Sequence, residues 1–334
     1  MATIGATFPT ILDIVRREAP DGSIDPEIVE SLTQLNPILE DIPWMEGNLP
    51  TGHRYTSRNS LPSLYWRKFN EGISPTKSTT KQVDETCGML TGMSKVDRDE
   101  AELNGNGPAF RATEDAAFQQ AFPNEVCRAL FYESVATNPE RVHGLTARFN
   151  VTSGNPAANQ IIKGDASASG ADQTSIWLIG WGLQTVCGIY PKGSKGGLQI
   201  KDMGLQLTRD NGGTKEFWAW VTDYRWKMGF MVKDSRYISR ACNIDTSNWK
   251  EDKSAGAILP SIMRKMVTAL FEVNTVKPVY YMNRATFDMF NAQLFASTVN
   301  FLEYVEMGGK RVPHFMGFPI RFIDALTSTE SVVS

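Results

Sequence analysis

The feature that most constrains the fold is a long segment, residues 48–102, that contains no hydrophobic core of its own. Between residues 52 and 81 the pattern predicts two extended arms, and prolines at positions 50, 62 and 75 disfavour helix and central-strand pairing in and just before this range. The arm that contains Arg54 and Arg58 has almost nothing apolar to bury, and an isolated two-stranded ribbon is marginal in water. We therefore expect this ribbon to lie on a neighbouring subunit.

Charge divides the same segment into a basic part and an acidic part. Residues 54–81, the basic ribbon, carry six bases against one acid, and residues 84–102 carry six acids against two bases. Complementary potentials steer and register an interface, so copies of the chain could dock head to tail; the alternative is a solvated loop with scattered charges. The candidate inter-subunit contacts are Arg54, Arg58, Arg67, Lys68, Lys77 and Lys81 in the ribbon, and Asp97, Asp99, Glu100 and Glu102 in the acidic segment, residues 97–102.

Composition is that of an ordinary globular protein long enough for one large domain or two smaller ones, with 334 residues, 41% apolar and 21% charged. The net charge of −3 argues against a dedicated nucleic-acid binder. No signal peptide is visible, and the most apolar run, residues 176–190, is too short to span a bilayer. The four cysteines are widely spaced, which indicates reduced thiols in a cytosolic setting rather than a disulfide framework or a zinc site.

Periodicity predicts a mixture of helices and strands, an α+β chain. The first 47 residues predict an arm with two short helices, the second of which Pro37 should bend or end. Apolar faces predict further helices at residues 113–132, 258–273 and 284–295, with Pro123 implying a kink or two abutting helices in the first of them. Glycine, serine and asparagine predict a long loop at residues 150–175.

Strands are predicted mainly in the second half. Residues 210–213, Asp-Asn-Gly-Gly, indicate a hairpin, and the returning strand places Trp218, Trp220 and Tyr224 on one face, which we expect to be buried against helices. Stacking of single-stranded nucleic-acid bases on this face is the alternative. Short strands are predicted at residues 278–282, 310–313 and 319–325.

No catalytic constellation emerges from the residues. His53, His143 and His314 are far apart and have no metal-ligand spacing, and the glycine-rich loop at residues 192–197 lacks the order of a phosphate-binding loop. No pair of acids combines with an apolar pocket signal, and no nucleophile elbow is present. We predict no catalytic residue, no metal site and no cofactor.

A series of short motifs runs in order along nearly the whole sequence: LTQLNPILED (32–41), Trp44, EGN (46–48), GHR (52–54), LPS (61–63), WRK (66–68), KSTT (77–80), VDE (83–85), LNG (103–105), SIW (175–177), GIYPKGS (188–194), YMNR (281–284), GFPI (317–320) and DAL (324–326). In these motifs the chain resembles the major capsid proteins of tailed bacteriophages, particularly of the podovirus-like kind.

The resemblance implies the Hong Kong 97-type capsid fold and a structural role, without catalysis, in an icosahedral shell enclosing double-stranded DNA. Such a protein would assemble in the host cytoplasm into hexamers and pentamers of a virion. Its partners would be scaffolding, cement and portal proteins and weakly, non-specifically bound DNA, with no membrane. The implied division is an N-terminal arm at 1–47, an extended loop at 48–86, a mainly peripheral domain at 87–245 with a spine helix near 113–132, a mainly axial domain at 246–309, and C-terminal strands at 310–334.

Two other functions compete with the phage capsid. The first is the shell of a cellular nanocompartment with the same fold, which would need an inner groove for a cargo peptide. The second is of another class, a cytosolic hydrolase or a single-strand nucleic-acid-binding module. Particle size discriminates between these classes, because a shell protein forms megadalton particles and an enzyme forms a small oligomer.

Overall fold

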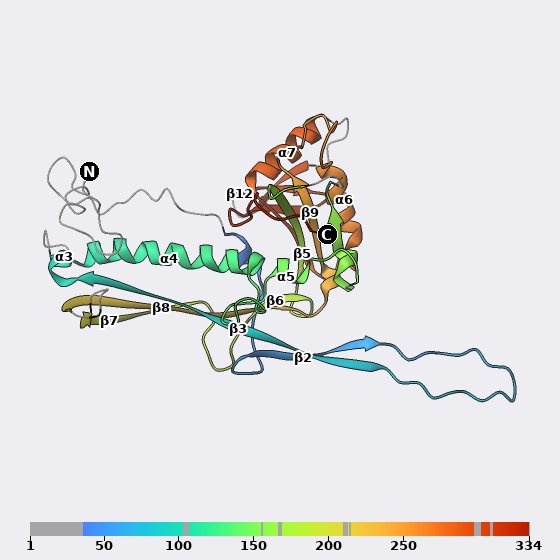
Figure 1. The fold of residues 1–334 in the computed structure, drawn as a ribbon, viewed down its shortest axis with the longest axis horizontal. Coiled ribbons are helices and arrows are strands. Elements are labelled where there is room, and N and C mark those ends of the chain that lie inside the picture. The colour runs from blue at the N-terminus through green and yellow to red at the C-terminus, as the bar shows by residue number, and fades with distance from the viewer. Residues whose placement is uncertain are drawn as a thin grey trace. The chain divides into compact units, whose positions relative to one another are not determined.

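A computed structural model of the chain describes residues 36–102, 107–154, 156–165, 169–209, 213, 215–296, 302–307 and 310–333. The chain divides into two compact units (Figure 1). The described parts of the smaller unit lie within residues 89–125 and 197–226. Those of the larger unit lie within residues 35–88, 126–196 and 227–334.

Helices and strands largely occur in separate runs along the chain, as the α+β prediction requires. The α-helices are α2 (Ile38–Asp41), α3 (Arg98–Glu102), α4 (Gly107–Tyr132), α5 (Leu145–Arg148), α6 (Leu259–Ala269) and α7 (Arg284–Phe295), with 3-10 turns η2 (Pro156–Gln160) and η3 (Ser235–Tyr237). The strands are β1 (Trp44–Glu46), β2 (Gly52–Ser60), β3 (Thr79–Asp97), β4 (Ile161–Lys163), β5 (Gln173–Trp181), β6 (Val186–Tyr190), β7 (Leu198–Arg209), β8 (Glu216–Val232), β9 (Ile238–Asp245), β10 (Lys277–Met282), β11 (Leu302–Met307), β12 (Lys310–Phe315) and β13 (Phe318–Phe322).

The larger unit is built on a seven-stranded sheet in the order β11-β12-β13-β10-β5-β9-β4. Its interior strand β5 is buried along all nine residues. The core combines Ile176 and Leu178 of β5 with Met263 and Met266 of α6 and Phe290 of α7, so both helices cover this sheet (Figure 1). Burial of this apolar surface is the main stabilising term of the unit.

The predicted helices and strands of the last third are confirmed. The helix predicted at 258–273 is α6, and the helix predicted at 284–295 is α7 with the same bounds. The side chain of Asn283 caps α7 by accepting a hydrogen bond from the Thr286 backbone N–H. The sequence did not predict β11, whose six residues pair antiparallel with β12.

The prediction of a long loop at residues 150–175 is wrong, because η2, β4 and the beginning of β5 fall within it. Strand β4 is only three residues long, and it exists through parallel pairing with β9, a non-local contact. The polar beginning of β5 is buried because Gln173 exchanges backbone hydrogen bonds with Glu330 near the C-terminus. Both elements depend on partners more than 70 residues away.

Helix α4 begins six residues before its predicted start, at Gly107, with Pro108 in the first turn. It continues through Pro123 as one helix of 26 residues, so of the two predicted alternatives, a kink or two abutting helices, the second is wrong. A proline inside a helix costs about 3 kcal/mol. Packing offsets this cost: within the smaller unit, the ring of Phe118 stacks on Tyr224 at 5.5 Å between centroids, and Phe122 lies 5.9 Å from the same ring.

Strands β7 and β8 form the predicted hairpin, with Leu207 opposite Trp218 and Leu205 opposite Trp220. The face that contains Tyr224 packs against α4, as expected, because Phe118 stacks on Tyr224. The prediction that the whole aromatic face is buried is wrong for Trp218, which is 52% exposed. This hairpin belongs to a six-stranded sheet with the order β1-β6-β8-β3-β2, in which β7 pairs with β8.

Strands β2 and β3 form the predicted ribbon, but their extents differ from the prediction. The second arm was predicted at residues 65–81, whereas residues 61–78 contain neither helix nor strand, so only its last three residues are in β3. Strand β3 begins at Thr79 and runs for 19 residues to Asp97. The two predicted N-terminal helices lie mainly outside the described residues, which begin at residue 36; α2 starts directly after Pro37.

Candidate inter-subunit surface

The ribbon of β2 and β3 is held by its own cross-strand ion pair. Arg54 lies opposite Asp84 in the register, and its Nε and Nη2 donate to the Asp84 carboxylate at 2.5 and 2.7 Å. Hydrogen bonding between the two groups raises the pKa of Arg54 and lowers the pKa of Asp84. The Asn48 side chain also hydrogen-bonds the Arg54 backbone N–H and carbonyl at 2.8 and 2.7 Å. Arg54 was predicted as an inter-subunit contact; here its charge is already compensated by a neighbouring strand.

The beginning of β2 is anchored in the larger unit by an aromatic side chain. Tyr55 packs against a buried cluster that includes Ile189 and Met231, and its hydroxyl donates to the Val232 carbonyl at 2.8 Å. Burial, reinforced by the charge of Glu85, raises the pKa of Tyr55 to about 12. The inference that this arm has almost nothing apolar to bury is therefore wrong at Tyr55. Alternation along β2 turns this one side chain toward the unit.

A buried ion pair holds β3 next to the position where Tyr55 anchors β2. Arg148, which ends α5, donates from Nη1 and Nη2 to the two carboxylate oxygens of Glu85, both at 2.7 Å. The two side chains are 15% and 7% exposed, and Arg148 also donates to the carbonyls of His143 and Phe230. Bidentate pairs of this kind are strong and geometrically specific. This ion pair therefore fixes the start of the ribbon within the larger unit.

Beyond β2 the chain forms an exposed loop, residues 61–78, which we call the extended loop tip. A turn at Asn70, whose φ is +66°, reverses its direction. Glu71 accepts a hydrogen bond from the Lys68 backbone N–H at 2.9 Å, and the Thr76 hydroxyl donates to the Ser63 carbonyl at 2.8 Å. Few internal contacts hold the tip, and most of its residues are exposed to solvent.

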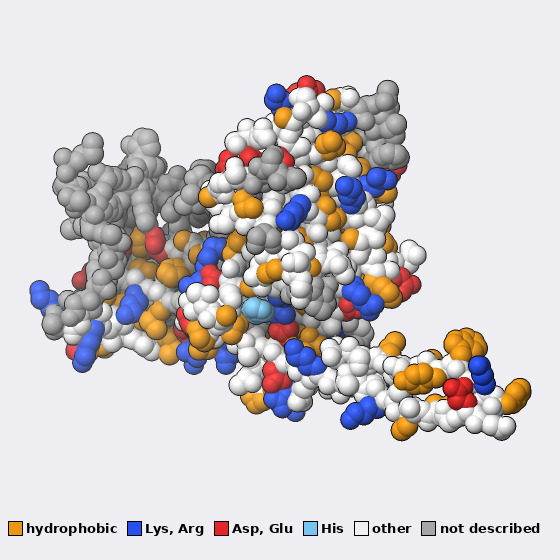
Figure 2. Space-filling view, turned by 45° about the vertical axis from the view of Figure 1, so that its right-hand side comes forward, with side chains coloured by type: hydrophobic (Ala, Val, Ile, Leu, Met, Phe, Trp, Pro, Cys, Tyr) orange, Lys and Arg blue, Asp and Glu red, His pale blue; other side chains and the backbone are white. Residues whose placement is uncertain are grey.

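The apolar side chains of the extended loop tip are almost fully exposed. Trp66 is 104%, Phe69 100% and Leu64 90% exposed, and Figure 2 shows hydrophobic groups gathered at the end of the projecting loop. Large exposed apolar groups in such a cluster mark an interaction surface. The sequence reasoning considered these residues as an arm and missed the apolar tip, although the run of apolar residues between Pro62 and Pro75 was its signal.

The other predicted bases lie along the ribbon and the tip. Arg58 is near the end of β2 and Lys81 near the start of β3, while Arg67, Lys68 and Lys77 belong to the tip. All five are exposed. Arg67 donates to the Glu71 carbonyl at 3.2 Å, a contact within the tip itself.

The acidic segment lies at the end of β3 and in α3. The Asp97 carboxylate accepts a hydrogen bond from the Asp99 backbone N–H at 2.9 Å, and Arg98 forms an ion pair with Glu102 at 3.0 Å. Asp99 and Glu102 are exposed, and Glu100 is half-buried. The segment and the basic ribbon belong to different units, and their pairing between copies stays a prediction.

The described residues offer little for catalysis or metal binding. No group of three or more histidine, cysteine or acidic side chains within these residues could hold a metal ion. Burial lowers the pKa of His53 and of His143, and the Nδ1 of His314 lies 3.0 Å from the Val312 carbonyl. All four cysteines are free. Within the same residues, no helix is long and apolar enough to cross a membrane.

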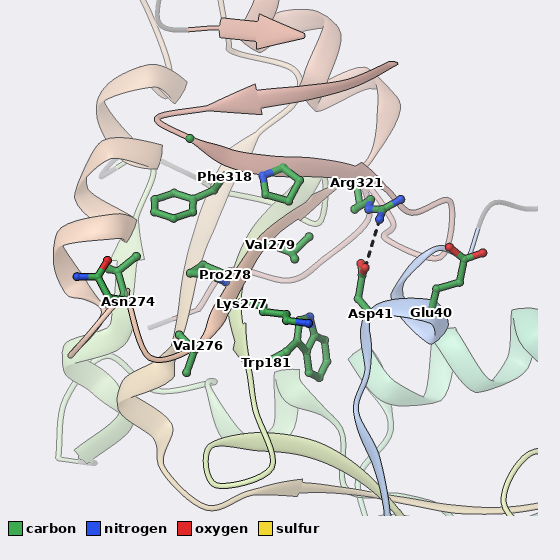
Figure 3. A pocket seen from close by; sticks show the side chains of 13 residues that line it. Glu40, Asp41, Trp181, Asn274, Val276, Lys277, Pro278, Val279, Phe318 and Arg321 are labelled. Atoms are coloured by element: carbon green, nitrogen blue, oxygen red, sulfur yellow. Dashed lines mark hydrogen bonds and ion pairs between the residues drawn. The ribbon is translucent and has the colours of Figure 1, made fainter. Parts of the chain in front are cut away.

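A cavity of about 580 Å³ in the larger unit has polar groups that satisfy one another (Figure 3). Asp41 accepts from Arg321 at 3.3 Å and from the Tyr281 hydroxyl at 2.8 Å, and the Trp181 indole N–H donates to the same hydroxyl at 2.7 Å. Burial raises the pKa of Asp41 despite these hydrogen bonds. The lining contains no serine, cysteine or histidine.

Two aromatic rings of β8, those of Tyr224 and Trp220, are already in contact with neighbouring side chains. The Tyr224 ring is covered by Phe118, and the Arg111 guanidinium lies 4.6 Å from the centroid of Trp220. These contacts use the faces on which bases would stack. They favour the sheet-core interpretation over single-strand binding.

Comparisons with known proteins agree with this structure. A chain in the cryo-EM structure of bacteriophage Epsilon15 is 32% identical with a TM-score of 0.77, over 100% of this chain and 99% of that chain. The bacteriophage JBD30 capsid is 10% identical with a TM-score of 0.50, over 92% and 96%. The SrpI encapsulin from Synechococcus elongatus PCC 7942 is 10% identical with a TM-score of 0.45, over 73% and 98%. No curated protein matches the chain.

The family match covers more of the chain than the described structure does. The sequence model described as Major capsid protein GP7 matches residues 19–334. This match and the Epsilon15 likeness confirm the predicted Hong Kong 97-type capsid fold. We conclude that the chain belongs to the Major capsid protein GP7 family and is a bacteriophage major capsid protein, the subunit of a capsid shell.

Proposed function

We propose that this subunit assembles as hexamers and pentamers into an icosahedral shell around double-stranded DNA, and that the extended loop tip is buried on a neighbouring copy. The observation that carries the proposal is the near-complete exposure of Trp66, Phe69 and Leu64 on a loop without a core. Burial of such side chains contributes about 1.5–3 kcal/mol each. A closed shell repeats the contact in every subunit, so modest contacts sum to a stable particle.

Several finer features of the proposal rest on family membership. The role is structural and non-catalytic, and assembly takes place in the host cytoplasm with scaffolding, cement and portal proteins as partners. Packaged DNA is held weakly and non-specifically, which suits a chain of net charge −3. The segments take the roles of N-terminal arm (1–47), extended loop (48–86), mainly peripheral domain (87–245), mainly axial domain (246–309) and returning C-terminal strands (310–334).

Charge supports the same docking mode. Arg58, Arg67, Lys68, Lys77 and Lys81 are exposed on the ribbon and its tip, and Asp97, Asp99, Glu100 and Glu102 form the acidic segment. Complementary charge sets orientation and association rate more than affinity. In this proposal the apolar tip supplies the binding energy and the charges supply the register. Arg54 contributes to the ribbon's own stiffness through Asp84.

Deletion of the extended loop tip tests the proposal. Ser60 and Thr79 are register partners, so residues 61–78 can be replaced by Asn-Gly, which closes a two-residue hairpin. This shorter deletion keeps Tyr55, which removal of residues 54–81 would take from the core. We expect native circular dichroism and loss of particles in electron micrographs and in size-exclusion chromatography.

A matched variant separates loss of contact from loss of loop length. Trp66→Ser with Phe69→Ser keeps the chain length and the charges, and it should also impair particle formation. Shells of wild-type size from the deletion variant would refute the proposal. Loss of the native circular dichroism spectrum would show instead that the tip belongs to the subunit's own core.

A further inference from the structure

A second charged feature lies where the ribbon meets the extended loop tip. A hollow of about 680 Å³ in the larger unit lies between the end of β2, the turn η2 and the chain around η3. Its lining is polar or charged except for one leucine, and it combines residues that are about 175 positions apart in the sequence. We call it the basic hollow; it is lined by Ser57, Arg58, Asn59, Ser60, Leu61, Asn159, Gln160, Lys233, Asp234, Ser235 and Arg236.

The charges around the basic hollow do not cancel. Asp234 is paired with Arg236, whose Nη2 donates to it at 2.7 Å and whose guanidinium lies 3.9 Å from the Phe271 ring centroid. Lys233 donates to the Leu183 carbonyl at 2.9 Å, a neutral partner. The Arg58 side chain is exposed and forms no hydrogen bond or ion pair with the described residues. Two positive charges therefore remain uncompensated in an open concave surface.

The positive charge of Lys233 also affects the pKa of His53. Burial, followed by the charge of Lys233, lowers the pKa of His53. A hollow with low-dielectric walls and one sign of charge attracts groups of the opposite sign. The shape and the charge together specify an anionic partner that is compact rather than extended.

We propose that the basic hollow binds the acidic segment, residues 97–102, of a second copy of this chain. The segment has four acids against one arginine, and its Asp99 and Glu102 are exposed. It ends a strand and turns at once into the short helix α3, so it offers a compact group of carboxylates. This inference rests on the proposed shell function and adds Lys233 and Arg236 to the predicted contacts.

Nucleic acid is the other anionic partner that a basic surface could take. Proteins that hold DNA through its backbone present several cations along a track, and a duplex carries one charge per about 1.7 Å. The basic hollow has two uncompensated cations and is confined to one depression. Its charge and size fit one acidic turn better than a polyanion.

Cysteine crosslinking tests this contact in assembled shells. Asn59→Cys places a thiol at the exposed edge of the hollow, and Asp99→Cys places one in the acidic segment. Mild oxidation of shells that carry both substitutions should give a ladder of covalent oligomers on non-reducing gels. The matched control combines Asp99→Cys with Thr268→Cys, an exposed position on α6, and should give no ladder. Burial raises the pKa of Cys87 and Cys187 to about 11, so the native thiols react slowly.

Charge exchange gives a second, independent measurement. Arg58→Glu with Lys233→Glu should abolish particle formation, and adding Asp97→Lys with Asp99→Lys should restore particles. If shells with Asn59→Cys and Asp99→Cys assemble but give no ladder of covalent oligomers on the gel, the inference is wrong and the shell function is unaffected. Normal shells from the Arg58→Glu, Lys233→Glu variant with reduced DNA retention would identify a nucleic-acid surface and also overturn it. The proposed function is tested separately: shells that assemble after deletion of the extended loop tip would refute it.

Discussion

The C-terminal segment is held by a buried ion pair whose loss should be costly. Glu330 accepts hydrogen bonds from Arg240 at 2.8 Å, from the Tyr132 hydroxyl at 2.7 Å and from the Ser175 hydroxyl. The Arg240 and Glu330 side chains are 1% and 6% exposed. We predict that Glu330→Gln destabilises the subunit strongly, because a buried guanidinium is left without its counter-charge.

The magnitude follows from what remains around Arg240. Its Nη1 still donates to the Phe149 carbonyl at 2.6 Å, its Nε still donates to Ser175 at 3.1 Å, and its guanidinium still lies 5.0 Å from the Trp177 ring centroid. Removal of one partner of a buried pair costs about 3–5 kcal/mol. The glutamine amide keeps a hydrogen-bond acceptor, so we expect the lower end, about 3 kcal/mol.

Urea unfolding followed by tryptophan fluorescence measures the effect, at one protein concentration because assembly also stabilises the fold. The matched control is Glu216→Gln in the exposed pair with Arg209, whose side chains are 49% and 71% exposed. That substitution should cost only about 0–1 kcal/mol. The double variant Arg240→Met, Glu330→Leu should cost less than Glu330→Gln alone, because it removes both charges. Equal losses for Glu330→Gln and Glu216→Gln would refute the reasoning.

Two further predictions concern the stability of the separate units. Trp220→Ala should lower the free energy of unfolding by about 2 kcal/mol, because Trp220 is only half-buried, under Arg111. Phe131→Ala should lower it by about 3–5 kcal/mol, because Phe131 is a fully buried core aromatic. Equal losses of stability in urea unfolding would contradict this prediction. For Glu133, burial raises the pKa, but hydrogen bonds from asparagine and arginine side chains outweigh it and lower the pKa below 4.5. The contribution of Glu133 to folding stability is therefore present above pH 4.5 and is lost as the pH falls through the folded-state pKa. Glu133→Gln should reduce the free energy of unfolding at about pH 7 and leave it unchanged at about pH 2. An equal loss at both pH values would argue against this role of Glu133.

Much of the local structure is encoded in short stretches of the sequence. The bounds of α7 follow from its apolar periodicity, and the β7–β8 hairpin follows from the Asp-Asn-Gly-Gly turn. The existence of a ribbon at residues 52–81 followed from alternation and from the lack of a core around it. These features depend on neighbours within a few residues, so periodicity and turn chemistry are sufficient to predict them.

Other features exist only because distant residues meet. Arg54 finds its partner Asp84 across the ribbon, and Tyr55 finds a buried cluster more than 130 residues away, so neither charge nor alternation along β2 predicted them. Helix α4 stays continuous through Pro123 because aromatic packing on Tyr224 outweighs a local penalty. The basic hollow joins Arg58 to Lys233 and Arg236. The sequence by itself determined the longer helices and the two hairpins, because their signals are local. The tertiary structure decided where the short strands β4 and β11 pair and which charges are already compensated, because strand pairing and electrostatic compensation depend on distance in space.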